Sequence, residues 1–421
     1  MLLAGLAAVA LVRYFAVGQA VGAKARQLHV LDAAAYSGAL VQARALNMLA
    51  YINRAHVGHQ LAMAHLLTLG SWASLGAAQS RQLAVGNPPS YLIAMLFGAE
   101  HGAAYLAASR ASGLEALAHS QSGLAQAYAA HDRTVRETLS VVQSDIVQGL
   151  PQARWTAMQA VLGANYPEAP AGRFELRVTE DGWPGYVQAY APRHPAMRSL
   201  VLGAAALYRF LDARNHTASN AWMVDARCVG RRHQLRRRGA TELDDLGRWQ
   251  SIDTQSFHAL RSNRWIGCYH REYAMGWGWI PGAASQTMSE AHVDDPPDDF
   301  SEQDFWRWVR DATDWDIASG QDNPLANSKA AASRPQWQGG GLPVYFDVAE
   351  AGAGVPLRFG VALRHPGPDE LVISTASAAE AFFQRPQARA DGRAELPNLF
   401  HPYWQARLAP SAPPAQTEAS Q

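Results

Sequence analysis

The side chains with the most distinctive chemistry in this sequence are its two cysteines, Cys228 and Cys268. Neither belongs to a Cys-x-x-Cys motif or to a Cys/His cluster with the spacing of a zinc site. In an exported protein such a pair forms one disulfide, whereas in a reducing cytosol it stays as two free thiols. A bridge would close a loop of about 40 residues and contribute roughly 4 kcal/mol in the chain-entropy model. We predict that the two cysteines are bridged, which would support export.

Histidines and carboxylates carry weaker signals. His56, His59 and His65 lie in one helical stretch, but on scattered faces and with no Asp, Glu or Cys beside them, so we predict no metal site there. The acidic run 294–299 could supply oxygen ligands to Ca²⁺. It lacks the alternating spacing and the closing Glu of an EF-hand, and a solvated acidic loop is the expected structure.

A basic cluster occupies 231–238. It could bind an anion or an acidic partner, but a charged edge that blocks strand addition is the favoured interpretation. The glycines of 276–282 are interleaved with tryptophans and a proline, which fits no phosphate-binding loop. We expect an aromatic β-turn region there.

Catalytic signatures are missing from the sequence. It contains no Walker A loop, no GxGxxG, no GxSxG elbow and no HExxH. We therefore predict no catalytic residue, no cofactor and no metal, and we do not expect an enzyme. The formal net charge is zero and charged residues make up 17%, which argues against a nucleic-acid partner.

The elements that would position any site begin with a long helix. From 31 to 69, apolar residues recur with a seven-residue repeat that no proline interrupts. A period of 3.5 residues predicts a helix packed along a seam against another helix, as in a coiled coil. Many seam residues are small, which favours close approach of two backbones. The predicted seam consists of Val41, Ala45, Met48, Ile52, Ala55, His59 and Ala62.

A second long helix is expected after the break at 86–90. It would run from Tyr91 to about Gly149, where Gly-Leu-Pro ends it. Two long helices joined by a short connection are antiparallel neighbours. The sequence thus predicts a long helical hairpin over 23–165.

Residues 1–22 are almost wholly apolar and about long enough to cross a bilayer, which takes roughly 20 residues. Arg13 in the middle would cost roughly 2.5–3.5 kcal/mol on insertion scales. The segment could instead be the apolar core of a signal peptide or the buried start of a soluble helix. We favour a membrane anchor or an assembly stem. By the positive-inside rule, Lys24 and Arg26 favour a cytoplasmic location for the C-terminal side of the segment, in conflict with export.

Beyond residue 172 the pattern becomes strand-like, and twelve of the thirteen tryptophans come after residue 150. We expect a β-hairpin over 174–190, a helix over 196–214, and short helices at 301–311 and 377–383. Strands are expected over 221–279 and at 344–348, 357–363 and 371–375. The fold class is α+β: an N-terminal apolar helix, a long antiparallel helical hairpin, then a mixed α+β domain with mainly antiparallel strands. The expected domains are 1–22, 23–165 and a Trp-rich 172–410, with a disordered tail at 411–421.

The N-terminal pattern resembles a known family. An apolar segment, a short basic spacer and the helix start Leu28-His-Val-Leu-Asp-Ala-Ala-Ala-Tyr-Ser-Gly-Ala39 resemble the beginning of TadE/TadG-like proteins of tight-adherence (Tad/Flp) pilus assembly. The likeness covers residues 1–75, and the stretch from Glu395 to Arg407 is similar to the ending of uncharacterised proteins in that group. The chain lacks the DxSxS metal motif and the N-terminal Glu of some members, so metal-dependent adhesion and prepilin-type processing do not carry over.

The resemblance implies a structural or assembly component of a bacterial Tad/Flp-type pilus, similar to a minor pilin. Such a protein would be held in the inner membrane by residues 1–22, with a periplasmic domain or a place in a surface appendage. It would act by packing against other pilus or pilus-assembly subunits. The alternative is an extracytoplasmic enzyme or ligand-binding protein with its site in 172–410. A deep polar pocket with perturbed titratable groups would favour that alternative.

Overall fold

The computed structural model describes residues 2–110, 113–167, 174–192, 194–244, 246–264, 267–281, 337–350, 354–368 and 371–410. Its helices are α1 (Leu2–Val85), α2 (Ser90–Phe97), α3 (Ala99–Ala107), η1 (Ala108–Arg110), α4 (Leu114–Ala118), α5 (Gly123–Arg133), η2 (Thr134–Leu139), α6 (Ser140–Asn165), α7 (Pro195–Ala205), η3 (Arg209–Leu211) and η4 (Ala226–Cys228). Its strands are β1 (Glu175–Asp181), β2 (Val187–Tyr190), β3 (His216–Ser219), β4 (Gln234–Leu243), β5 (Trp249–Asn263), β6 (Gly267–Pro281), β7 (Tyr345–Val348), β8 (Leu357–Pro366), β9 (Val372–Phe383) and β10 (Trp404–Ala409).

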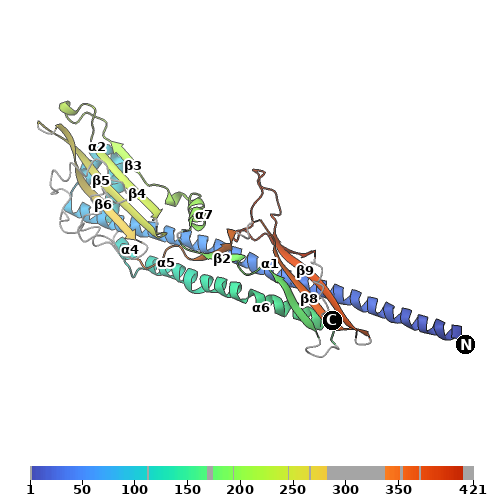
Figure 1. Cartoon of the computed structure of the whole chain (residues 1–421). Coiled ribbons are helices and arrows are strands. Elements are labelled where there is room, and N and C mark those ends of the chain that lie inside the picture. Colours follow the sequence, from blue (N-terminus) through green and yellow to red (C-terminus); the bar gives the residue numbers. More distant parts are fainter. Residues whose placement is uncertain are drawn as a thin grey trace. The chain divides into compact units, whose positions relative to one another are not determined.

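The chain forms two compact units, and the 84-residue helix α1 contributes to both (Figure 1). Unit 1 comprises Met1–Ala55, Leu139–Tyr190 and Val344–Gln421, and unit 2 comprises His56–Thr138 and Ala191–Pro343. These units divide the chain differently from the predicted ranges 23–165 and 172–410. Each unit combines part of α1 with its own sheet, because strands distant in sequence pack directly on the long helix.

In unit 1, α1 packs against α6 and against a sheet of order β1-β8-β9-β10, all of whose pairs are antiparallel. The core contains small residues of α1 such as Ala34 and Ala35, with Met158 of α6 and Phe359 of β8. Gly38 of α1 lies close against this core. A Cβ added to it would lie 2.8 Å from the Phe359 ring, closer than such atoms pack. Small residues therefore do let the helix approach its neighbours closely.

In unit 2, the sheet has the order β3-β4-β5-β6 and is antiparallel throughout. The C-terminal part of α1 crosses β6 at Gly276 and Gly278. A Cβ on Gly278 would lie 2.3 Å from the carbonyl oxygen of Ser71, so only glycine permits this contact. The region predicted as an aromatic turn is thus the end of a long strand, and its glycines serve helix–sheet packing.

The antiparallel helical pair is present in unit 1, and unit 2 also has a helix against α1. In unit 1, α6 runs antiparallel to α1, because Arg26 contacts Asn165 while Asn53 contacts Gln143. In unit 2, His59 of α1 contacts His131 of α5. The single second helix predicted from Tyr91 to Gly149 is wrong, because the described part of this stretch forms several short helices, interrupted at Gly98 and Gly113 among other places. The predicted end at Pro151 is wrong as well, since α6 continues to Asn165 with Pro151 inside it. Packing of the buried residues Arg154, Met158 and Leu162 outweighs the local penalty of the proline.

The buried face of α1 has the predicted seven-residue period but a different phase. Its residues, each 0% exposed, are Gln42, Leu46, Leu49, Asn53, His56, Gln60, Met63 and Leu67. Every member of the predicted seam lies one residue earlier, which is about 100° around a helix. Met48 is consequently 47% exposed, Ile52 is buried, and Val41, Ala45, Ala55, His59 and Ala62 are half-buried. Reading apolar residues alone missed the seam because four of its members are polar.

Several local predictions are corrected by the sheets. Residues 174–190 form no hairpin, since β1 pairs with β8 and β2 pairs with β7. The short helix expected at 377–383 is the second half of β9, where ladders to β8 and β10 override the helical preference of its alanines. Arg236, Arg237 and Arg238 do not form the predicted charged sheet edge, because they belong to β4, which lies between β3 and β5, and Arg231 and Arg232 precede this strand.

The α+β class, with its N-terminal apolar helix, helical pair and antiparallel strands, is confirmed. Strands were also correctly expected near 344–348, 357–363 and 371–375. The seam is not that of a coiled coil, because its partners include strands as well as a helix. The predicted acidic loop 294–299, the helix 301–311 and the tail 411–421 lie outside the described residues.

Candidate functional site

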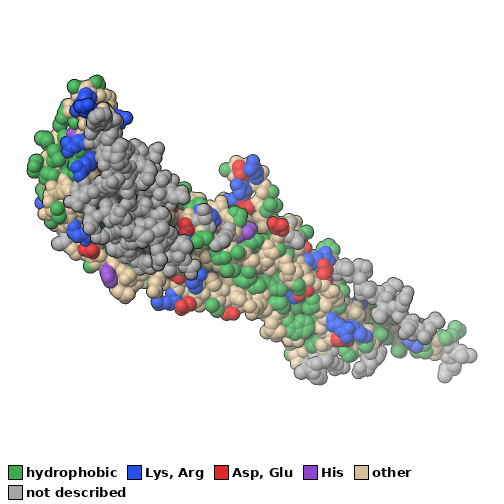
Figure 2. All heavy atoms as spheres, turned by 60° about the vertical axis from the view of Figure 1, so that its left-hand side comes forward, with side chains coloured by type: hydrophobic (Ala, Val, Ile, Leu, Met, Phe, Trp, Pro, Cys, Tyr) green, Lys and Arg blue, Asp and Glu red, His purple; other side chains and the backbone are tan. Residues whose placement is uncertain are grey.

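The first turns of α1 form the most exposed apolar segment that the structure describes. Leu3, Val9 and Phe15 are 84%, 60% and 66% exposed, and Arg13 is the one charged residue before Lys24. Figure 2 shows hydrophobic side chains along the visible side of this segment, at the right of the view. By length and composition α1 could cross a membrane once, and the window that qualifies has none of its residues buried.

Two side chains fasten α1 to unit 1 directly after this segment. Arg26 donates a hydrogen bond of 2.7 Å to the carbonyl oxygen of Asn165, and its guanidinium lies 4.7 Å from the centre of the Tyr166 ring. The amide nitrogen of Gln27, a residue 1% exposed, donates to the carbonyl oxygens of Leu363 and Ile373 at 2.9 and 3.1 Å. The apolar segment is therefore continuous with a helix that is tied to both α6 and the sheet (Figure 1).

Further along α1, two asparagines hold the C-terminal segment of unit 1. Asn53 donates to the carbonyl oxygens of Phe346 and Leu399 at 2.8 and 2.6 Å, and Gln143 of α6 donates to its side-chain oxygen. Asn47 bonds both the N–H and the C=O of Trp404. The stretch from Glu395 to Arg407 thus has a structural role, because Leu399 and Trp404 within it are hydrogen-bonded to α1.

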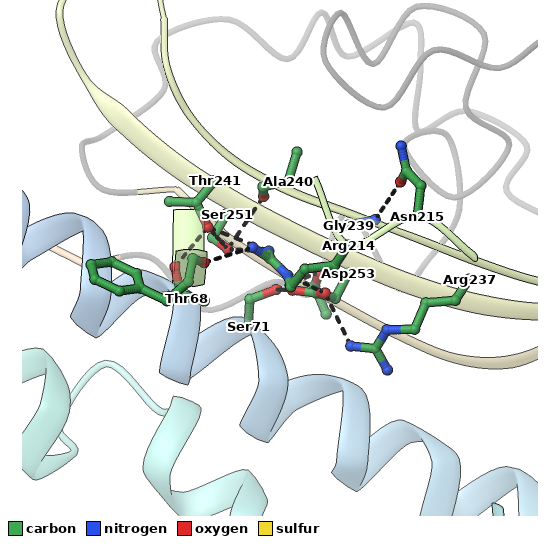
Figure 3. Close-up of polar contacts among 12 residues, drawn as sticks. Thr68, Ser71, Arg214, Asn215, Arg237, Gly239, Ala240, Thr241, Ser251 and Asp253 are labelled. Carbon is green, nitrogen blue, oxygen red and sulfur yellow. Dashed lines mark hydrogen bonds and ion pairs between the residues drawn. The ribbon is translucent and has the colours of Figure 1, made fainter. Parts of the chain in front are cut away.

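The polar centre of unit 2 is Asp253, whose side chain is fully buried (Figure 3). Arg214 donates two hydrogen bonds of 2.9 Å to its carboxylate, and Arg237 donates one of 3.2 Å. Ser71 of α1 donates to the second oxygen at 2.8 Å. A Cβ on Gly239 would lie 2.3 Å from this carboxylate, which explains a glycine in the middle of β4.

This cluster can hold α1 on the sheet, but its geometry offers little chemistry. Both carboxylate oxygens are occupied by donors, and Thr68, Thr241 and Ser251 extend the network as a chain of hydroxyl contacts of 2.7 and 2.8 Å. A fully partnered buried charge pair fixes geometry rather than acting on a ligand.

A second buried group superficially resembles a catalytic triad. Ser256 Oγ lies 2.9 Å from His258 Nε2, and Glu272 Oε1 lies 3.4 Å from the same nitrogen. In a triad the serine and the carboxylate contact opposite ring nitrogens, so that the base can take the serine proton. Here both contact Nε2, and all three residues are less than 5% exposed. Although desolvation opposes it, the contact with His258 lowers the pKa of Glu272.

Three histidines lie where α1 meets α5 in unit 2. His59 Nδ1 and His131 Nδ1 are 2.8 Å apart, so one must donate and the other accept. Burial and the neighbouring His131 lower the pKa of His59. Burial, then His59 and Arg136, lower the pKa of His56 to about 4. Among the described residues no group of three His, Cys, Asp or Glu side chains could hold a metal ion.

The predicted disulfide is present. Cys228 and Cys268 are bonded, with their Cα atoms 5.9 Å apart. It joins η4 to the start of β6 in unit 2. A disulfide is typical of proteins in an oxidising, extracytoplasmic compartment.

Sequence reasoning found the apolar segment and the disulfide, but missed the groups that organise the interior. Asp253 could have been suspected, because an acid at an inward position of a strand needs a cationic partner. His131 carries no sequence signal, since its neighbour His59 is 72 residues away.

Comparisons with protein-family models, curated proteins and solved structures find no match to this chain.

Proposed function

We propose that this chain is a structural or assembly component of a bacterial Tad/Flp-type pilus, anchored in the inner membrane by the start of α1 and acting outside the cytoplasm through protein–protein packing. The observation that carries the proposal is the segment 2–22, which is helical and largely apolar, and whose described side chains are exposed except at the half-buried Ala16 and Ala20. An exposed apolar surface of this size requires a lipid or protein environment.

The way α1 joins the apolar segment to unit 1 supports a role in positioning the folded body rather than a catalytic role. The apolar segment continues without a break into the helix that Arg26 and Gln27 fasten to α6 and to the sheet. A rigid connection of this kind would hold the body at a defined height above a membrane. The Cys228–Cys268 disulfide agrees with a location outside the cytoplasm.

The enzyme alternative has less support. The triad-like group at Ser256 is buried, and both Ser256 and Glu272 contact the same nitrogen of His258, so no carboxylate orients the imidazole from its opposite nitrogen as a triad requires. The Asp253 cluster is likewise enclosed and fully bonded. We propose no catalytic role for either.

Deleting the gene and counting surface fibres by electron microscopy tests the proposal. We expect few or no fibres in the deletion strain and normal fibres when the full-length chain is restored. A version lacking residues 2–22 but carrying a cleavable export signal should be made and folded, yet should not restore fibres.

The matched control replaces residues 2–22 by an unrelated single membrane span. Rescue by this version would assign the segment to simple anchoring, and failure would assign it to specific assembly contacts. Normal fibres in the deletion strain would exclude a pilus function.

A further inference from the structure

A cavity of about 450 Å³ lies in unit 1 where the apolar segment of α1 ends. One wall is α1 itself, from Gly18 to Gln27. The opposite wall includes Tyr166, the end of β8 at His365 and Pro366, and the two residues that follow, Gly367 and Pro368. A Cβ added to Gly18 or Gly22 would have no atom within 4 Å. The two glycines, one helical turn apart, therefore leave room along the helix at the mouth of the cavity.

The walls of this cavity are amphipathic and of one charge sign. Arg26 contributes a guanidinium, and no Asp or Glu is among the described residues that line it. Tyr166 lies between Arg26 and His365, with ring-centre distances of 4.7 Å to the guanidinium and 5.2 Å to the imidazole. Ile373 and the prolines supply apolar contact. Such a site suits an anion that carries an apolar tail.

The position of the cavity along α1 narrows the choice of ligand. Its lining begins at Gly18, inside the apolar segment, and ends at Arg26 and Gln27, where the helix joins the body. If residues 2–22 cross a membrane, this is the level of the lipid headgroups, where Tyr, Arg and Lys are enriched.

We propose that this cavity binds the phosphate-bearing headgroup of an anionic glycerophospholipid, with the phosphate at Arg26 and an acyl chain along the Gly18–Gly22 face. The inference rests on the proposed membrane anchoring. It also gives Arg26, one of the two basic residues that conflict with export by the positive-inside rule, a structural partner and a lipid phosphate on the outer side.

A second helix could in principle use the same glycines, since small residues four apart favour helix pairing in membranes. Beyond Ala23, however, a helix running alongside α1 would meet Pro366, Gly367 and Pro368. A compact headgroup fits this closed end better than a continuous helix does.

Native mass spectrometry of the full-length, delipidated protein in detergent tests the inference, with phosphatidylglycerol as the probe. We expect one lipid per chain. Arg26→Gln should weaken binding at least about tenfold through loss of charge-assisted hydrogen bonds. Lys24→Gln is the matched control, because Lys24 lies two residues away and does not line the cavity. It should change binding less than about twofold.

Gly22→Leu provides a second variant, because it fills the cavity while leaving the contacts of Arg26 intact. It should also weaken binding at least about tenfold, and it decides the matter if Arg26→Gln fails to fold. Phosphatidylcholine should bind more weakly, and excess glycerol 3-phosphate should not displace the lipid. Any of four outcomes would overturn the inference. These are equal effects of the Lys24 and Arg26 variants on binding, unchanged binding in Gly22→Leu, displacement of the lipid by glycerol 3-phosphate, and a second chain bound in place of a lipid.

Fractionating cells separates this inference from the proposed function. A full-length chain found outside the membrane fraction would contradict anchoring itself. A chain that is in the membrane but retains no lipid contradicts only the assignment of the cavity.

Discussion

The guanidinium of Arg214 holds the fully buried carboxylate of Asp253 by two hydrogen bonds of 2.9 Å, one to each oxygen. Ser71 of α1 donates to the same carboxylate, so this pair also joins the helix to the sheet of unit 2. Buried charges are tolerated only with such partners, and removing one partner leaves the other charge uncompensated.

We therefore expect Arg214→Leu to lower the free energy of unfolding by about 3–5 kcal/mol. Chemical denaturation at neutral pH would measure the loss. Arg81→Leu is the control, because it breaks an ion pair with Glu115 whose side chains are 53% and 73% exposed. That change should cost less than about 1 kcal/mol. Equal losses in the two variants would show that the Asp253 pair does not hold unit 2 together.

The stability should fall in acid because of His56. Its pKa is lowered to about 4 from 6.5, chiefly by burial. Below pH 6.5 the unfolded chain binds a proton that the folded chain excludes, so stability is lost as the pH falls from 6.5 to about 4. The loss from this group amounts to about 3 kcal/mol. His56→Leu should flatten the pH profile of the melting temperature, whereas His119→Gln, at an exposed site, should leave it unchanged. A profile as steep in His56→Leu as in the parent would rule out this origin.

The phase of the α1 seam predicts opposite sensitivities at neighbouring positions. Leu46 is 0% exposed and Met48 is 47% exposed, although the apolar pattern of the sequence placed Met48 in the seam. Leu46→Ala should cost about 2–5 kcal/mol by creating a cavity. Met48→Ala should cost less than about 1 kcal/mol. Urea denaturation compares the two variants. A larger loss of stability in Met48→Ala than in Leu46→Ala would favour the seam predicted from the sequence over the one in the structure.

Two polar seam residues should respond differently to the same change. Asn53 donates to two carbonyl oxygens, whereas the buried side-chain atoms of Gln42 have no hydrogen-bond partner among the described residues. Gln42→Leu should leave stability unchanged or raise it by about 1 kcal/mol, because an unpaired buried amide is removed. Asn53→Leu should lower it by about 2 kcal/mol or more, because it leaves the carbonyl oxygens unpaired. Thermal melts of both variants provide the comparison, and matching losses would contradict the different pairing of the two amides.

The disulfide should contribute to the stability of unit 2. Replacing Cys228 and Cys268 together by serine opens a loop with a sequence separation of 40 and should lower the free energy of unfolding by roughly 4 kcal/mol. Treating the parent with a reductant should produce a similar loss, and the reductant should not affect the serine variant. A parent whose melting temperature is insensitive to reductant would show that the bridge is not stabilising.

Local and periodic features of the fold could be predicted from the sequence alone. An uninterrupted apolar run at residues 1–22, a seven-residue repeat over 31–69 and alternation near 357–363 each depend on residues close together in the chain. These patterns predicted the exposed apolar helix, the long helical pair and the antiparallel strands. The disulfide was predictable as well, because Cys228 had only Cys268 to pair with.

The tertiary structure decided everything that depends on partners distant in the sequence. Counting apolar residues missed the polar members of the seam. Asn53 and Gln60 are stable inside because groups remote in the sequence accept their hydrogen bonds, and His56 because burial favours its neutral form. β9 is a strand through Ala378 and Ala379 because β8 and β10 supply its ladders. The cavity at Arg26 likewise brings together residues from 18–27 of α1, Tyr166, residues 365–368 and Ile373. No local sequence pattern predicts such long-range contacts, because their interaction energies arise only when folding has brought the groups together.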